Sequence, residues 1–169
     1  CAEMRGLFSS LRRDQSGAVA VEFGLWSILF FVGALAAFDL GDLYMKRSQM
    51  SAAVSAASLQ AFDQRESVQF TGLTAYVRAL ANDQNLSVTI SCNGVAGSCV
   101  NNNRPCACLT QSATYVAQAC GTPCTGAGQT TGVNSGYYLT IEASRTMNPV
   151  LVRGRANTRL THAATVRLQ

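Results

Sequence analysis

The residues best able to take part in chemistry are cysteines. Six of the seven fall within 33 positions: Cys92, Cys99, Cys106, Cys108, Cys120 and Cys124. Such density is typical of a domain that folds in an oxidising compartment and pairs its cysteines as disulfides. Six cysteines allow 15 pairings, and the sequence does not choose among them. Zinc is the competing interpretation, because the last four could supply thiolates, but their spacings differ from those of paired zinc knuckles. We expect three disulfides and no metal.

Other residues offer little for catalysis. His162 is the only histidine, and it falls on the apolar face of an expected strand. Asp39 and Asp42 lie three residues apart, and Lys46 follows Asp42 in the order that favours a helical ion pair. The chain has no phosphate-binding glycine loop, no HExxH and no nucleophile elbow. We therefore expect a protein that is not an enzyme and binds no cofactor.

The composition points to a membrane. Of the 169 residues, 48% are hydrophobic and only 13% are charged, against roughly 25% charged in soluble domains. The 13 basic residues are spread along the whole chain, which argues against a nucleic-acid-binding surface. The apolar excess is concentrated from Ala18 to Phe38, which reads AVAVEFGLWSILFFVGALAAF. At 1.5 Å per residue this helix would be about 31 Å long, enough to cross a bilayer.

The flanks of this segment indicate its orientation. Arg5, Arg12 and Arg13 precede it, Lys46 and Arg47 follow it, and all six clustered cysteines lie after it. Together these favour a bacterial inner-membrane protein with a cytoplasmic N-terminus and a periplasmic C-terminal domain. The apolar stretch is longer than that of a secretory signal and continues from Asp39 to Arg47 without a proline, so we expect a retained span rather than a removed signal. Cys1 leaves open a lipid-modified N-terminus, which the arginines oppose.

The rest of the chain predicts helix and then strands. An apolar stripe continues the helix through Leu43, Met50, Val54, Ala57 and Ala61, and a second helix is expected around 67–82. A period of two predicts strands over 86–92, 137–144 and 160–168. The fold class is therefore α+β: a transmembrane helix that extends into a long helix packed on a small antiparallel sheet, with a disulfide-rich loop region. We divide the chain into a basic leader-like segment (1–17), a transmembrane helix (18–44), an extramembrane helical segment (45–84) and a Cys-rich β domain (85–169).

Two stretches near the N-terminus carry a family resemblance. The run from Arg12 to Phe23, RRDQSGAVAVEF, and the run from Phe38 to Tyr44, FDLGDLY, resemble the TadE/TadF-like pseudopilins of tight-adherence pili. The resemblance implies cleavage by a prepilin peptidase after Gly17, a new N-terminus at Ala18 and a glutamate, Glu22, at the fifth mature position. It implies a minor pilin or pseudopilin that acts in pilus assembly.

Small residues suggest how the span meets its partners. Gly33, Ala37 and Gly41 lie four apart and form a smooth strip where another helix can approach closely, although such residues can also face lipid. We expect the partners to be membrane lipid and other pilin-like subunits, with no nucleic acid. The alternative is an accessory or scaffolding subunit of a larger inner-membrane complex, for example photosynthetic, respiratory or transport, that reuses a TadE-like fold.

Overall fold

The computed structural model describes residues 15–147 and 158–169. Cys1 and most of the leader-like segment lie outside the described residues, as do Arg153 and Arg155. The described residues divide into two compact units, one up to Asp42 and the other from Leu43 to Met147 with residues 158–169. We describe each unit by itself.

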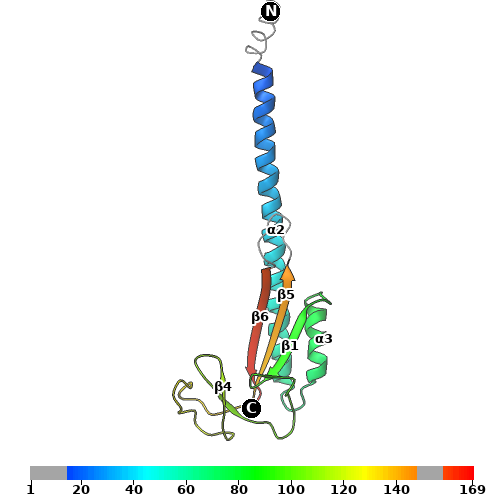
Figure 1. Ribbon diagram of the computed structural model, residues 1–169. Coiled ribbons are helices and arrows are strands. Elements are labelled where there is room, and N and C mark those ends of the chain that lie inside the picture. The colour runs from blue at the N-terminus through cyan, green and yellow to red at the C-terminus, as the bar shows by residue number, and fades with distance from the viewer. Residues whose placement is uncertain (1–14, 148–157) are drawn as a thin grey trace, which may run out of the picture. The chain divides into compact units, whose positions relative to one another are not determined.

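The longest element is helix α2, Gln15–Asp63, which has 49 residues (Figure 1). Its sequence contains no proline, and the first proline of the chain is Pro105, so nothing in this stretch removes a backbone hydrogen-bond donor. Alanine and leucine are frequent in it, and both favour helix. The predicted continuous helix is confirmed, and its first 28 residues, up to Asp42, belong to the first unit.

The second unit contains a four-stranded antiparallel sheet among its described residues. The strand order is β2 (Val95–Ala96), β1 (Ser87–Cys92), β5 (Tyr138–Met147) and β6 (Thr158–Arg167). Ile141 in β5 pairs with Ile90 in β1 and Ala164 in β6, so these three share one face of the sheet. The three strands predicted from alternating polarity are β1, β5 and β6.

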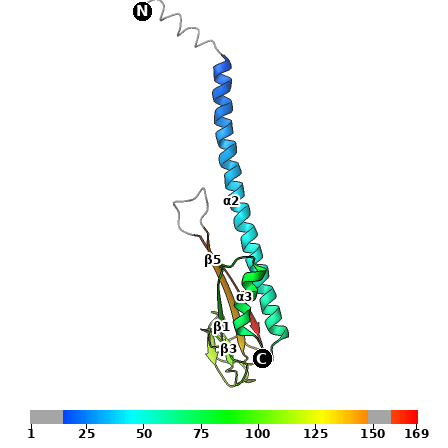
Figure 2. The ribbon, with the colours of Figure 1, turned by 90° about the vertical axis from the view of Figure 1, so that its right-hand side faces the viewer.

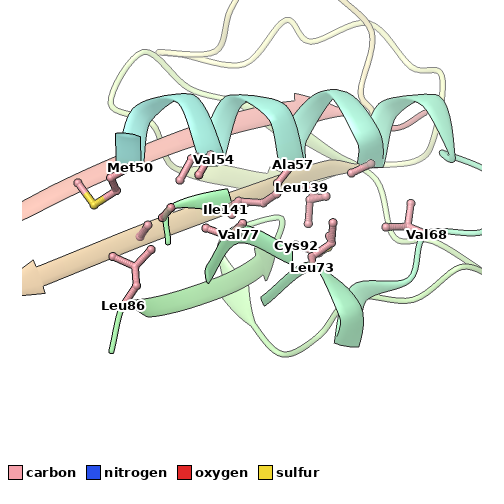
Figure 3. Packing of buried hydrophobic residues seen from close by; sticks show 14 of the residues in the cluster. Met50, Val54, Ala57, Val68, Leu73, Val77, Leu86, Cys92, Leu139 and Ile141 are labelled. Atoms are coloured by element: carbon pink, nitrogen blue, oxygen red, sulfur yellow. The ribbon is translucent and has the colours of Figure 1, made fainter. Parts of the chain in front are cut away.

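The second half of α2 and helix α3 (Phe70–Leu80) cover one face of this sheet (Figure 2). Met50, Val54 and Ala57 on α2 meet Leu139 and Ile141 on β5, with Leu73 and Val77 of α3 at their side; these labelled residues form the centre of the core in Figure 3. The apolar stripe predicted for α2 is therefore its buried face, with Leu43 only partly buried. Three alanines on this face, at 53, 57 and 61, are at most 2% exposed, which lets the helix backbone lie close to the strands.

The segment between β1 and β5 contains short strands and three disulfides. β3 (Ala107–Leu109) and β4 (Tyr115–Ala117) form a two-stranded antiparallel sheet. The disulfides join Cys92 to Cys99, Cys106 to Cys120 and Cys108 to Cys124. The predicted α+β class with a disulfide-rich loop region is confirmed, and the structure supplies the pairing that the sequence left open.

Candidate functional site

The proposed processing residues lie at the start of α2. The helix begins at Gln15, so Gly17 and Ala18 are in its first turn, where backbone N–H groups have no acceptor within the helix. Gly17 and Ala18 are both exposed among the described residues, and a Cβ atom built on Gly17 would meet no heavy atom within 4 Å.

Glu22 lies one turn further along the same helix. It is four residues after Ala18, which places both on one face of α2 and about 6 Å apart along the axis. The Glu22 side chain is exposed in the monomer. A carboxylate deep in a bilayer costs about 3 kcal/mol unless it is paired, so a nearby amine would be a favourable partner.

The large apolar side chains from Val19 to Leu40 are exposed. The large hydrophobic residues of this stretch are between 48% and 76% exposed, including Phe23, Trp26 and Phe38. Among the described residues, only α2 is long and apolar enough to cross a membrane, and its most apolar window has a mean hydropathy of 2.0 with none of it buried. Thirteen large apolar side chains without protein cover need lipid or other helices around them.

The strip Gly33, Ala37 and Gly41 lies within this exposed stretch. All three residues are exposed, and a Cβ atom at Gly33 or Gly41 would meet nothing within 4 Å. Steps of four residues turn the helix by about 400°, so the three positions stay within one face. The strip is a face of small residues between larger ones, and small residues let a second helix backbone approach closely.

The disulfide segment is tied to the helices at its start. Asn101 accepts a hydrogen bond from the Val68 N–H through Oδ1 and donates one to the Val68 carbonyl through Nδ2, both at 3.1 Å. The Tyr137 hydroxyl accepts from the Val100 N–H at 2.9 Å, and Arg104 donates to the carbonyl of Arg65. These bonds hold the chain that follows the Cys92–Cys99 disulfide against the α2–α3 connection.

The middle of this segment, at β4, lies against the face of the sheet opposite the helices. Tyr115 of β4 packs on Tyr138 of β5 with ring centroids 5.7 Å apart, and its hydroxyl is 3.1 Å from Oγ1 of Thr140. Gly94 lies beneath the same ring, where a Cβ would come within 2.9 Å of it. The hydroxyls of Thr140 and Thr165 meet at 2.9 Å, so polar contacts continue across the sheet.

The remaining candidates for chemistry have structural roles. Nε2 of His162 on β6 is 3.3 Å from Oγ of Ser51 on α2, and both side chains are partly buried between helix and sheet. Within the described part of the chain no group of three or more His, Cys, Asp or Glu side chains could hold a metal ion. The four cysteines weighed as zinc ligands are joined in two disulfides.

Sequence reasoning did not foresee one ion pair. Arg145 of β5 contacts Asp83 in the loop between α3 and β1, and the Asp83 side chain is only 11% exposed. Glu142 is the last acidic residue of the sequence, but the acid that Arg145 contacts lies 62 positions before it. The pair joins two segments that only the sheet pairing brings together.

Comparison with known proteins identifies one family. The family model described as TadE-like protein matches residues 17–59, which is most of α2 and includes Gly17, Glu22 and the strip. The resemblance expected from the sequence is confirmed over this segment. Searches of curated proteins and of solved structures found no match to the chain. The family match and the long apolar helix fit a pilus-related protein with a single membrane span.

Proposed function

Starting from a TadE-like segment at residues 17–59, we propose that this protein is a pseudopilin or minor pilin that acts in assembly of a tight-adherence pilus. The observation that carries the proposal is that the matched segment is also the exposed apolar helix. All thirteen large apolar side chains that are exposed between Val19 and Leu40 lie within the matched residues 17–59. A helix of this kind can leave the bilayer only if other helices replace the lipid around it.

Cleavage after Gly17 supplies the charge partner in this proposal. It would create an amine on Ala18, one helical turn from the Glu22 carboxylate and on the same face. The pair can form within one chain or between neighbours, and either arrangement lowers the cost of holding a carboxylate in an apolar bundle. Glu22 then favours the assembly of processed helices, because only these carry the Ala18 amine that pairs with its carboxylate.

The strip Gly33, Ala37 and Gly41 provides the packing surface. Close approach of backbones increases van der Waals contact where no hydrophobic effect drives association. Large side chains border the strip: Phe30 lies three residues before Gly33 on the same face, and Phe38 lies beside Ala37, both over 70% exposed. The small residues of the span thus contact one neighbouring helix, and its large side chains contact lipid or further helices.

The proposed orientation places the second unit in the periplasm. Arg5, Arg12 and Arg13 precede the span, and positive residues favour the cytoplasmic side. The three disulfides are in the unit that follows the span, and disulfides persist in oxidising compartments. Both observations support a cytoplasmic N-terminus.

Replacing Glu22 with Gln tests the role in assembly. We expect the Glu22→Gln protein to insert into the membrane normally, because the change removes a charge from the apolar segment, and to be incorporated into fibres at least tenfold less. Fibre content is measured by immunoblot of sheared pili against membrane content. Glu66→Gln, an exposed glutamate between α2 and α3, is the control and should assemble normally. Equal incorporation of both variants would refute the proposed pairing.

A further inference from the structure

The loop between α3 and β1 contains an asparagine in a pattern that the site described above does not use. The chain has nine asparagines, and only Asn85 is followed two residues later by serine or threonine with no proline between, in the run Asp83-Gln84-Asn85-Leu86-Ser87. Asn-x-Ser is the acceptor pattern of N-glycosylation. Asp83, two positions before Asn85, places a carboxylate beside this pattern.

The structure places this pattern where a glycan can be carried. Asn85 and Ser87 are exposed, and Gln84 and Asn85 form a turn directly before β1. The backbone N–H of Asn85 donates to Oδ1 of Asp83 at 3.0 Å, so it is the backbone of Asn85 that shapes the turn. Leu86 between them is 2% exposed and anchors the loop in the core. The side chain amide of Asn85 is therefore presented on a fixed turn at the surface.

The surface beside Asn85 is polar and hollowed. A shallow hollow of about 500 Å³ is lined by Asn85, Ser87, Ser144, Thr146 and the two arginines 145 and 159. Arg159 donates to Oγ of Ser144 at 3.1 Å, which holds a guanidinium and hydroxyls on one side of the hollow. Hydroxyl and guanidinium groups are good partners for the hydroxyls and amides of a sugar. A first sugar residue on Asn85 would lie against this lining.

We propose that Asn85 is an N-glycosylation site. In the transfer, the side-chain nitrogen of Asn85 forms a bond to the anomeric carbon of an oligosaccharide carried on a polyprenyl pyrophosphate. The bond from that carbon to the pyrophosphate oxygen breaks, the polyprenyl pyrophosphate leaves with the electron pair, and the nitrogen loses one proton to the enzyme's base. No oxidation or reduction takes place.

The fold also indicates when the transfer occurs. In the folded domain Arg145 engages the Asp83 carboxylate beside the acceptor pattern. Arg145 is 62 residues further along the chain, and β5, which pairs with β1, begins only at Tyr138. The sequon therefore emerges before its folded partners do, and transfer precedes their docking. Because Asn85 and Ser87 stay exposed afterwards, the finished domain accommodates the glycan.

The test uses the full chain co-expressed in bacteria with a bacterial oligosaccharyltransferase and its lipid-linked oligosaccharide. Intact mass should show one added oligosaccharide on the native chain and on Asn102→Gln, an exposed asparagine outside any acceptor pattern. Asn85→Gln and Ser87→Ala should lose it, whereas Ser87→Thr, which preserves the pattern, should retain it. A native chain without added mass, or Asn85→Gln with it, would overturn the assignment.

This inference rests on the proposed function in one respect only: both place the β domain outside the cytoplasm. The same sample is therefore labelled with a thiol reagent after denaturation without reduction. Blocked cysteines together with an unmodified Asn85 would overturn the glycosylation site and leave the pilin proposal intact. Six reactive cysteines would show that the domain stayed inside, which would overturn the orientation and the glycosylation site together.

Discussion

Replacing Ile141 with alanine tests how the second half of α2 is held on the sheet. Ile141 is fully buried, with Ile90 and Ala164 beside it on the neighbouring strands and the helices above it (Figure 3). The change removes three carbons, worth about 2.4 kcal/mol at roughly 0.8 kcal/mol per methylene. Strands on both sides keep the site from collapsing, so a cavity raises the expected loss to about 3–4 kcal/mol of unfolding free energy.

Urea unfolding of the full chain in detergent measures this loss. Trp26 is the only tryptophan and lies in the first half of α2, so its fluorescence does not report on the sheet. Tyrosine near-UV circular dichroism does, because Tyr137 and Tyr138 are buried beside the core. With an m-value of about 1–3 kcal/mol per molar urea, the midpoint should fall by more than about 1 M.

Glu142→Ala is the matched control, one residue further along β5 on the exposed face. It should change the unfolding free energy by no more than about 0.5 kcal/mol. A loss below about 1 kcal/mol for Ile141→Ala, or equal losses for the two variants, would show that the helix and sheet are not packed around Ile141 as described.

Two further predictions concern the span and the cysteines. Gly33→Leu or Ala37→Leu should reduce recovery of the protein with its partner assembly at least tenfold, because the added side chain separates the backbones. Leu35→Ala, on the opposite side of the helix from the strip, should matter much less. Equal recovery of all three variants in co-purification would mean that the strip faces lipid. Thiol labelling of denatured, unreduced protein should find at most Cys1 reactive, since the structure pairs the other six cysteines. Six reactive thiols or stoichiometric zinc would contradict the disulfide framework.

Local pattern was sufficient for the regular elements of the fold. The stripe on α2 and the alternation in β5 and β6 follow from the geometry of helix and strand, so the sequence predicts both strands to within three residues of their ends. The hairpin from β1 to β2 had a readable signal in Asn93-Gly94, whose φ angles of +48° and +80° suit a tight turn. The three-residue strands β3 and β4 are too short to show a period.

Long-range pairing was beyond the sequence. Which of the 15 pairings forms depends on where the folded loop places its cysteines, and local pattern does not show that. The Asp83–Arg145 pair depends on β5 lying beside β1. The roles assigned to Gly17 and Glu22 rest on the family resemblance. The groups that they and the strip would contact belong to other molecules, so the fold of one chain does not define them.

The N-terminal mass of the protein isolated from its native membranes tests the central claim most directly. Processing after Gly17 predicts a chain whose first residue is Ala18, with the six clustered cysteines oxidised in three disulfides. A chain that retains residues before Ala18 would contradict the pilin assignment and would favour a stable subunit of a larger membrane complex.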